Sequence, residues 1–437
     1  MTNIVSNFGQ IFADGILYYG VEMEGKIHFI SSKKENLELK ALEDKGIRFP
    51  IIQNYEAHPY SCLKNKPWSS ESIDNFLKPD QSQRIVDPKE LFLRVKNIIR
   101  KFPHPEDENE LLFLTLFPFQ SSLYSVFKTT PYYSVVGDSY LKQLLLELME
   151  KISFNGIRLN SPHGSLLSRM ISLYGSTLII TMNHDHPGNH FNSVLSALEE
   201  GCRSSGSFCE LSERGLPISL PIYSSKILDL GIRDKCLKNL FIEIQVEKQP
   251  DSPFYLHMTE TEQELQKLRD DLHICCLENV NPISNIYQNL ETIPGISNQC
   301  MEFLSGTFSI AKHLDTFFEV PFLFDSMVIW AKEMVLRFKH NQKFDDKDTH
   351  ILYLVAEFTQ RFKPDTDGYY VAEDIARYIN DAGDLSDKLR PEDVTRRLKR
   401  FHPHRKRDKM VINDEGDKRR RTKIKFDYDK LLKQVDA

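Results

Sequence analysis

The sequence predicts an α/β protein: a mostly parallel sheet covered by helices on both faces, with a small β-rich region before it and a basic helical module after it. In the middle of the 437-residue chain, short apolar runs alternate with amphipathic stretches, as strands and helices do around a parallel sheet. The run STLIITM (176–182) is uncharged and rich in β-branched residues, which is typical of a strand buried on both faces. Towards the C-terminus the pattern changes to helical periodicity with many basic residues.

The composition excludes several classes of protein. Hydrophobic residues make up 41% of the chain and charged residues 27%, which is ordinary for a globular protein and excludes wholesale disorder. No run approaches the roughly 18 apolar residues of a membrane span, and the N-terminal sequence MTNIVSNFGQIFADG lacks the features of a signal peptide. The 7 cysteines are scattered without a CxxC pair, which argues against a disulfide framework or a zinc ribbon. We therefore expect a cytoplasmic protein that does not enter membranes.

The charge is distributed unevenly along the chain. The formal net charge is −6, but residues 386–433 hold 18 Lys/Arg against 9 Asp/Glu, a balance of +9 that leaves −15 for the remainder. A basic end on an acidic body suggests one surface specialised for a polyanion.

The expected elements fall into four regions. Region 1–85 is expected to be a small β-rich part that includes FADGILYYGVEMEGKIHFI, and region 86–250 is expected to be the α/β domain. Region 251–345 is expected to be a helical connector, with the aromatic segment FFEVPFLFDSMVIW (317–330) as helical core. The expected strands of the α/β domain are PYYSVV (131–136), STLIITM, SFCEL (207–211), SLPIYSS (219–225) and NLFIEIQVEK (239–248), and its expected helices are 139–152, 161–175 and 190–201.

Region 346–437 resembles a winged helix-turn-helix. Two amphipathic helices are expected over 346–362 and 368–381, and a third over 390–401 begins with Pro391 and two acidic residues, which suit a helix N-terminus. The segment TKIKFDY (422–428) then alternates apolar and basic residues, as one strand of a hairpin would. In a winged helix the third helix enters the major groove and the wing touches phosphates. The alternative to DNA binding is a winged helix that docks onto another protein, because such a module has the same pattern of helices and hairpin.

The basic residues fall where a DNA-binding winged helix would need them, on the outward face of the third helix and on the hairpin. The predicted DNA-binding residues are Arg390, Arg396, Arg397, Lys399, Arg400, Lys418, Arg419, Arg420, Arg421 and Lys423.

The order of weak motifs across the α/β domain resembles a known family. An apolar strand, Gly137 and a Leu-rich helix are followed by SPHGSLLSRM, STLII, LEEGCRSSGSFCEL, a strand, DKCLKN and a further strand. This order is similar to that of the P-loop ATPases found beside primases and replication helicases on phages and other mobile elements. The resemblance runs from about residue 85 to the winged helix. It implies a P-loop NTPase-like sheet and a nucleotide site.

The residues that such a site needs are degenerate. A phosphate-binding loop needs several glycines followed by Lys and Ser/Thr. The corresponding GDSYLKQ (137–143) offers Gly137 alone, with Lys142 one position early, so these two are the only candidate nucleotide-binding residues. Thr181 and Met182 follow the LII run where a magnesium-holding carboxylate belongs. The position of the family's arginine is occupied by Leu240. Electrostatic stabilisation dominates phosphoryl transfer, so these losses argue against hydrolysis.

A second constellation is the histidine-rich loop NHDHPGNH (183–190). His184, His186 and His190 at the end of a strand could meet on a metal ion, and the loop faintly resembles the metal-binding loop of metallo-β-lactamase-type hydrolases. The H-x-H-x3-H spacing is one residue too long, and Asn, Pro and Gly there suit an ordinary turn. We therefore expect a polar turn and no metal.

The sequence thus predicts a pseudo-ATPase of the mobile-element DNA-replication type, which binds duplex DNA and acts as an adaptor or assembly subunit. No catalytic residue is assigned and no cofactor is expected. The expected partners are double-stranded DNA and an active ATPase or another replication or defence protein, with oligomers allowed. Two alternatives stay open: an enzyme, either an ATPase with an unorthodox P-loop using ATP and magnesium or a metal-dependent hydrolase, and a transcriptional regulator.

Overall fold

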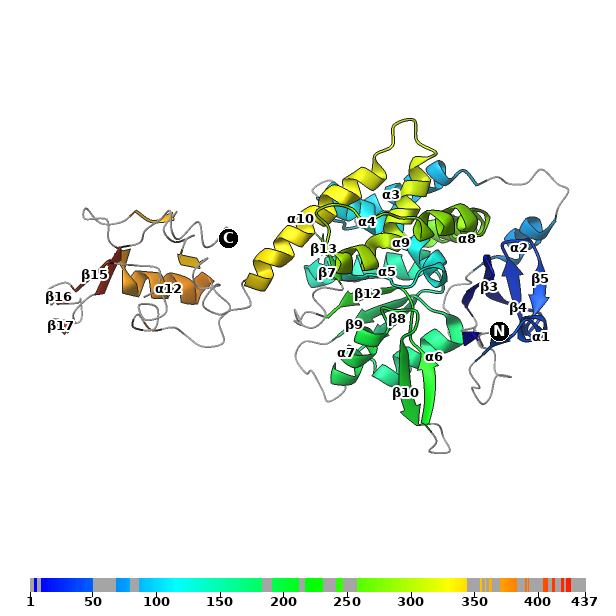
Figure 1. The fold of residues 1–437 in the computed structure, drawn as a ribbon, viewed down its shortest axis with the longest axis horizontal. Helices are drawn as coiled ribbons and strands as arrows, with labels where there is room; N and C mark the ends of the chain where they lie inside the picture. Colours follow the sequence, from blue (N-terminus) through cyan, green and yellow to red (C-terminus); the bar gives the residue numbers. More distant parts are fainter. Residues whose placement is uncertain are drawn as a thin grey trace. The chain divides into compact units, whose positions relative to one another are not determined.

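The computed structural model divides into two compact units, Met1–Glu333 and Met334–Ala437, and each is described by itself (Figure 1). In the first unit it describes residues 4–5, 9–49, 68–78, 86–182, 191–211, 217–230, 241–246 and 258–333. In the second it describes 334–343, 354–355, 358, 361–363, 370–382, 390, 392, 404–407, 411–412, 418–419 and 422–425. No helix among these residues is long and apolar enough to cross a membrane.

A five-stranded sheet lies at the centre of the first unit. Its strand order is β13-β7-β12-β9-β8, and every neighbouring pair is parallel. This confirms the predicted α/β class with a parallel sheet. The sequence predicts β7, β9 and β13, whereas it does not identify β8 or β12. The strands are β7 (Tyr132–Gly137), β8 (Ile157–Asn160), β9 (Leu178–Thr181), β12 (Lys226–Asp229) and β13 (Phe241–Val246).

The segments SFCEL and SLPIYSS do not extend this sheet. The first forms β10 (Ser207–Leu211), and the second overlaps β11 (Pro217–Pro221), and the two pair with each other as an antiparallel hairpin. The strand that returns to the parallel sheet is β12, which follows the hairpin.

Helices cover both faces of the parallel sheet (Figure 1). On one face, α6 (Gly164–Tyr174) and α7 (Phe191–Glu200) pack against the side chains that include Leu178, Ile180 and Leu228. On the other face lie α4 (Glu108–Leu123) and α5 (Ser139–Ile152), and the ring of Phe117 in α4 lies 4.7 Å from that of Tyr133 in β7. Three further helices, α3 (Pro88–Arg100), α8 (Met258–Gln288) and α9 (Asn298–Asp315), pack around α4.

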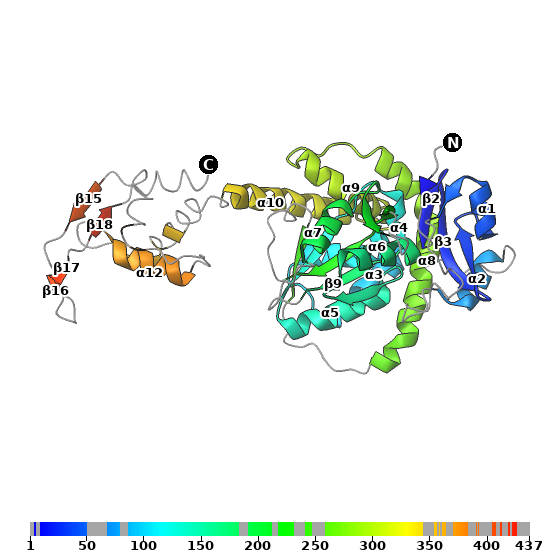
Figure 2. The ribbon, with the colours of Figure 1, turned by 90° about the horizontal axis from the view of Figure 1, so that it is seen from below.

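The N-terminal part is an antiparallel sheet with the strands in chain order, β2-β3-β4-β5. Strand β3 contacts α8, and α1 (Leu39–Asp44) lies on the other side of the sheet (Figure 2). The strands are β2 (Gln10–Ala13), β3 (Ile16–Met23), β4 (Lys26–Ser31) and β5 (Asn36–Glu38), and a short parallel pair joins β1 (Ile4–Val5) to β6 (Ile47–Arg48).

Buried hydrogen bonds attach this sheet to the end of α4. The Tyr19 hydroxyl donates to the Ser122 carbonyl, and Gln10 accepts from the Ser125 amide at 2.9 Å. Gly9 allows the chains to approach closely, because a Cβ at this position would lie 2.0 Å from the Tyr174 carbonyl oxygen. The N-terminal sheet is therefore packed into the first unit.

The aromatic segment 317–330 is not uniformly helical core, which corrects the sequence prediction. Residues 316–322 form a turn between α9 and α10 (Leu323–Lys343), and Val320 in it is 74% exposed. Asp315 fixes this turn, because its carboxylate accepts hydrogen bonds from the amides of Phe322, Leu323 and Phe324 at 2.8–3.0 Å. The cap sets the start of α10 and leaves the apolar residues before it in solvent.

The second unit combines α12 (Ala372–Ala382) with a small antiparallel sheet of order β14-β18-β15. Most of the third helix predicted over 390–401 lies outside the described residues. The strands are β14 (Tyr370–Val371), β15 (His404–Arg407) and β18 (Thr422–Lys425), and a separate short hairpin joins β16 (Val411–Ile412) to β17 (Lys418–Arg419).

Candidate functional site

The carboxyl ends of β7, β12 and β9 are the place where an open parallel sheet would hold a ligand. The chain leaves β7 towards the β8 edge and leaves β12 towards β13 on the other side, so the strand order reverses at these strands. Strand β7 ends at Gly137, β12 ends at Asp229 and β9 ends at Thr181. Asp229 and Thr181 are register partners, so they share one face of the sheet, the face that α4 and α5 cover.

The link between β7 and α5 is a single residue, Asp138. Its carboxylate accepts hydrogen bonds from the amides of Tyr140 at 2.9 Å and Leu141 at 3.2 Å. These amides belong to the first turn of α5, where a helix binds an anion through its free N–H groups and its dipole. Here the chain's own carboxylate takes that position.

Gly137 has a packing role at the same place. It adopts a φ of +135°, and a Cβ on it would lie 2.4 Å from the Val246 carbonyl oxygen of β13. This glycine therefore lets β7 and β13 approach closely at their ends. Its presence is explained without a bound phosphate.

Lys142 lies in the first turns of α5 and points to the sheet. Its Nζ is 2.7 Å from Oδ1 of Asp229, and the two side chains are only 8% and 4% exposed. A buried charge is tolerated when it is paired, so each residue compensates the other. The Thr181 hydroxyl beside Asp229 is buried and has no hydrogen-bond partner among the described residues. Lys142, which the sequence suggests as a nucleotide-binding residue, thus forms an ion pair with a carboxylate of the same chain.

Asp229 is not predicted from the sequence, because the pattern of its strand, β12, does not stand out as a strand. An apolar pair, Ile227 and Leu228, between two serines and a glycine is the local signal that could have revealed this strand. Its pairing with Lys142 could not be read from the sequence, since 87 residues separate the two.

A second missed residue is Lys226, at the opposite end of β12. Its Nζ donates to the carbonyls of Gly201, Ile222 and Ser224 at 3.0–3.1 Å and lies 4.9 Å from the Tyr132 ring centroid. Burial lowers the pKa of Lys226 to about 7. This lysine holds the loop after α7, which includes Gly201, against the segment before β12. Its role is structural, because the side chain is 1% exposed.

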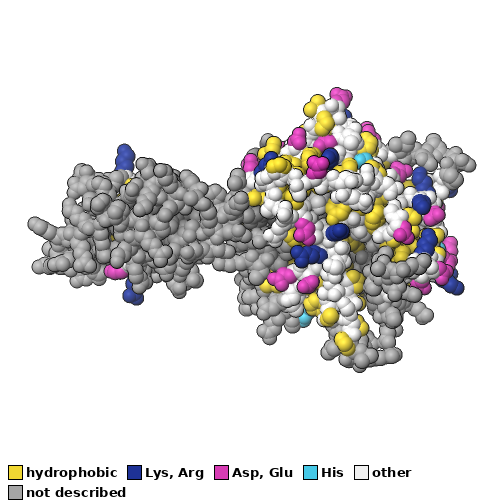
Figure 3. Space-filling view, viewed as in Figure 1, with side chains coloured by type: hydrophobic (Ala, Val, Ile, Leu, Met, Phe, Trp, Pro, Cys, Tyr) yellow, Lys and Arg dark blue, Asp and Glu magenta, His cyan; other side chains and the backbone are white. Residues whose placement is uncertain are grey.

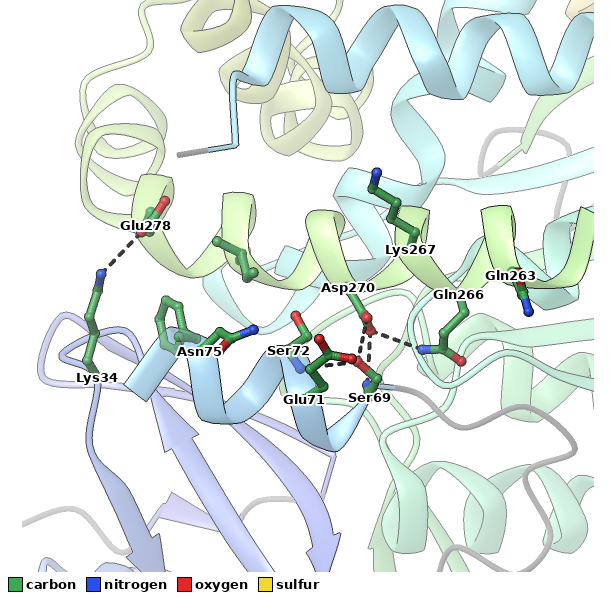
Figure 4. A pocket seen from close by; sticks show the side chains of 12 residues that line it. Lys34, Ser69, Glu71, Ser72, Asn75, Gln263, Gln266, Lys267, Asp270 and Glu278 are labelled. Carbon is green, nitrogen blue, oxygen red and sulfur yellow. Dashed lines mark hydrogen bonds and ion pairs between the residues drawn. The ribbon is translucent and has the colours of Figure 1, made fainter. Parts of the chain in front are cut away.

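A polar pocket of about 330 Å³ lies between α2 (Ser70–Leu77) and α8 (Figure 4). Asp270 of α8 holds Ser69, the N-cap residue of α2, by accepting from the Ser69 amide at 2.9 Å and from the Ser69 hydroxyl at 2.6 Å. Lys34 points across the pocket to Glu278 at 3.4 Å. These polar groups are paired across the pocket, so they join the N-terminal part to α8.

His273 of α8 packs near this pocket among aromatic rings. It stacks on Trp68 at 5.3 Å between centroids and touches Tyr19 and Phe154. Burial lowers the pKa of His273 to about 4, and its Nδ1 lies 2.6 Å from the Arg269 carbonyl oxygen. The neutral ring can donate that hydrogen bond.

Several predicted site residues lie outside the described residues. They are His184, His186 and His190 of the histidine loop, Leu240, and Arg396, Arg397, Lys399, Arg400, Arg420 and Arg421 of the basic module. Arg390 is described and exposed, and Lys418, Arg419 and Lys423 lie on β17 and β18. No group of three or more metal-ligating side chains occurs in the part of the chain that the structure describes.

Comparison with known proteins gives little support to any assignment. No protein-family model matches the chain, and no curated protein matches it. Two solved structures, both of the A-form apo C-terminal region of NrS-1, are similar at 12% sequence identity with TM-scores of 0.33 and 0.35. Each likeness covers 95% of this chain and 96% of the other. Likenesses this low carry no argument about fold or function.

Proposed function

We propose that this protein is a DNA-binding, non-hydrolytic relative of the P-loop ATPases of mobile-element replication, and that it acts as an adaptor or assembly subunit. The observation that carries the proposal is the buried ion pair between Lys142 and Asp229, which lies at the carboxyl ends of β7 and β12, where the strand order reverses.

The sheet order supports the relationship. Numbered along the chain, the five parallel strands lie in the order 5-1-4-3-2, with the first strand between the fifth and the fourth. A mostly parallel sheet is what the resemblance to the P-loop ATPases implies. The helix after the first strand, α5, is where those enzymes would bind phosphate through its N-terminus.

The chemistry of the same place supports the absence of hydrolysis. A phosphate cradle needs a loop long enough to curl around the anion, whereas one residue separates β7 from α5. Asp138 takes the amide donors, and Lys142 is neutralised by Asp229. The negative charge that develops on a phosphoryl group in the transition state would therefore lie near the Asp138 carboxylate, where an active site has a glycine loop. The positive charge of Lys142 would already be compensated by Asp229.

Charge supports DNA as the partner. The net charge of +9 falls within 386–433, and the sequence is basic along β15 and β18 of the small sheet and along β17 of the separate hairpin, as in a winged helix. On the face of the first unit in Figure 3, acidic and basic side chains are interspersed. A polyanion is therefore expected to bind the second unit.

Phosphate release and thermal unfolding of the full-length protein test the proposal. Magnesium-ATP should leave the melting temperature unchanged, whereas a ligand at a hundred times its Kd would stabilise the fold by about 2.7 kcal/mol. Duplex DNA should bind, with an affinity that falls as salt rises, and should not stimulate phosphate release.

DNA-stimulated phosphate release that disappears in Lys142→Ala would contradict the proposal. The double variant Lys142→Met with Asp229→Asn is the control for folding, because it removes both charges of the pair and leaves neither unpaired. Loss of release in that double variant too, with the fold retained, would assign a catalytic role to the pair of Lys142 and Asp229.

A further inference from the structure

We infer that the first unit binds ordered water molecules in its interior, at the amino-terminal edge of the parallel sheet. The groups that hold the water are the hydroxyls of Thr177 and Ser225 and the side-chain amide of Gln120, and the place is called the buried water site below. It lies at the opposite end of the strands from Asp229, and neither a nucleotide nor DNA takes part in it. The inference therefore goes beyond the proposed function and does not depend on it.

The register of the sheet places Thr177 and Ser225 side by side. Leu178 of β9 is the register partner of Lys226 of β12, and the Leu178 amide donates to the Ser225 carbonyl at 3.1 Å. Thr177 and Ser225 each lie one position before this pair, so they are opposite each other. Because side chains alternate between the two faces of a sheet, both hydroxyls lie on the same face.

That face is the one that α4 and α5 cover. The Ile157 amide of β8 donates to the Thr177 carbonyl at 3.0 Å, so Gly156 lies next to Thr177 on the third strand. A Cβ on Gly156 would lie 2.1 Å from the Glu150 carbonyl oxygen in the last turn of α5. The two hydroxyls are therefore enclosed between the sheet and the helices.

The polar atoms of this place are buried, and none has a hydrogen-bond partner among the described residues. Thr177 and Ser225 are both 0% exposed, and both hydroxyls lack a partner. Gln120 is also 0% exposed; its Oε1 accepts from the Thr307 hydroxyl at 2.7 Å and the Tyr133 hydroxyl at 3.3 Å, whereas its Nε2 has no partner. Buried polar groups in proteins are almost always paired, and ordered water pairs those that the chain does not.

Two hydrogen bonds join the end of α4, which carries Gln120, to Thr177. The Ser121 hydroxyl accepts from the Phe154 amide at 3.0 Å, and the Phe154 carbonyl accepts from the Thr177 amide at 3.2 Å. Hydroxyls both donate and accept, and an amide nitrogen donates, so the three groups suit water, which does both. All three are uncharged, and the N–H groups of Gln120 disfavour a cation. Water is therefore the ligand that these groups fit.

Urea unfolding of the full-length protein, followed by tryptophan fluorescence, tests the inference through the sign of one change. Thr177→Val keeps the shape of the side chain and removes only the hydroxyl. If water bonds to that hydroxyl, the variant should raise the unfolding equilibrium constant about fivefold, as the loss of one typical hydrogen bond does. If the hydroxyl is dry and unpaired, the same change removes a costly buried polar group and should lower the constant.

A double-mutant cycle tests whether the two hydroxyls share their water. Ser225→Ala alone should also raise the unfolding constant, and its combination with Thr177→Val should raise it by much less than the product of the two single effects. Thr115→Val is the matched control, because Thr115 is also 0% exposed but its hydroxyl already donates to the Leu111 carbonyl at 2.7 Å within α4. Combined with Ser225→Ala, the control should give the product of the single effects.

A high-resolution crystal structure of the full-length protein gives the direct readout. The expected result is ordered water within hydrogen-bond distance of both the Thr177 and the Ser225 hydroxyl. A direct hydrogen bond between the two hydroxyls with no water beside them would overturn the inference, and so would a Thr177→Val variant that is more stable than the wild type. Neither result would affect the proposed function, which concerns the other end of the sheet and the second unit.

Discussion

Replacing Lys142 by methionine should destabilise the first unit by about 3–5 kcal/mol, because it leaves the buried carboxylate of Asp229 without its partner. Methionine keeps most of the side-chain length, so the lost packing is small and the unpaired charge dominates. The Asp229 side chain is 4% exposed, so water cannot replace the ammonium group 2.7 Å away. The expected loss is a large part of the 5–15 kcal/mol that typically holds a domain together.

A double-mutant cycle in urea measures this pair. Adding Asp229→Asn to Lys142→Met should recover most of the loss, which gives a coupling energy of at least about 3 kcal/mol. Both tryptophans, Trp68 and Trp330, lie in the first unit, so their fluorescence follows the unfolding of that unit alone.

An exposed ion pair provides the control for the cycle. Lys101 and Glu264 are 3.8 Å apart, with side chains 58% and 48% exposed, and should couple by no more than about 1 kcal/mol. Additive effects of Lys142→Met and Asp229→Asn, or a loss below about 1 kcal/mol for Lys142→Met, would refute the reasoning that the pair is a closed structural unit.

Three further changes test the fold. Burial lowers the pKa of His273 to about 4. As pH falls from 6.5 towards 4, the unfolded state therefore binds a proton at this residue and the folded state does not. Urea unfolding should show that the free energy of unfolding falls by up to about 3 kcal/mol over this pH range. His273→Phe should remove this pH dependence. Asp315→Ala removes the acceptor of three amides at the start of α10, those of Phe322, Leu323 and Phe324, and should lower stability by about 1–2 kcal/mol. Asp325→Ala at an exposed position should change little. Gly9→Ala places a methyl group against the Tyr174 carbonyl and should lower the melting temperature through about 1–3 kcal/mol of overpacking.

Three of the five parallel strands were predictable from the sequence, and two were not. Strands β7, β9 and β13 contain apolar or β-branched runs that mark a buried strand. Strand β12 begins and ends with a charge, Lys226 and Asp229, so its pattern is that of a polar connection. Both charges are buried because tertiary partners satisfy them, and a local pattern contains no information on those partners.

The turn 316–322 shows the reverse error. Its aromatic residues predict buried helix, yet Phe317, Val320 and Phe322 are 38–74% exposed. Pro321 and the capping side chain of Asp315 determine where α10 begins, and the cap depends on a hydrogen bond across the turn that composition does not reveal. The candidate site was similarly half-predictable: Gly137 and Lys142 stand out in the sequence, and their contacts with Val246 and Asp229 follow only from the folded sheet.

These contacts also set how weakly a nucleotide could bind at the carboxyl ends of β7 and β12. A phosphate at the N-terminus of α5 would have to displace the Asp138 carboxylate from two amides, which costs about 1 kcal/mol. Recruiting Lys142 would break its buried pair with Asp229, which costs about 3–5 kcal/mol more. Together these terms weaken binding by about three to four orders of magnitude relative to a site that is already open. A micromolar nucleotide site would thus become a millimolar one or weaker. The same residues that fill the site hold β7, β12 and α5 together.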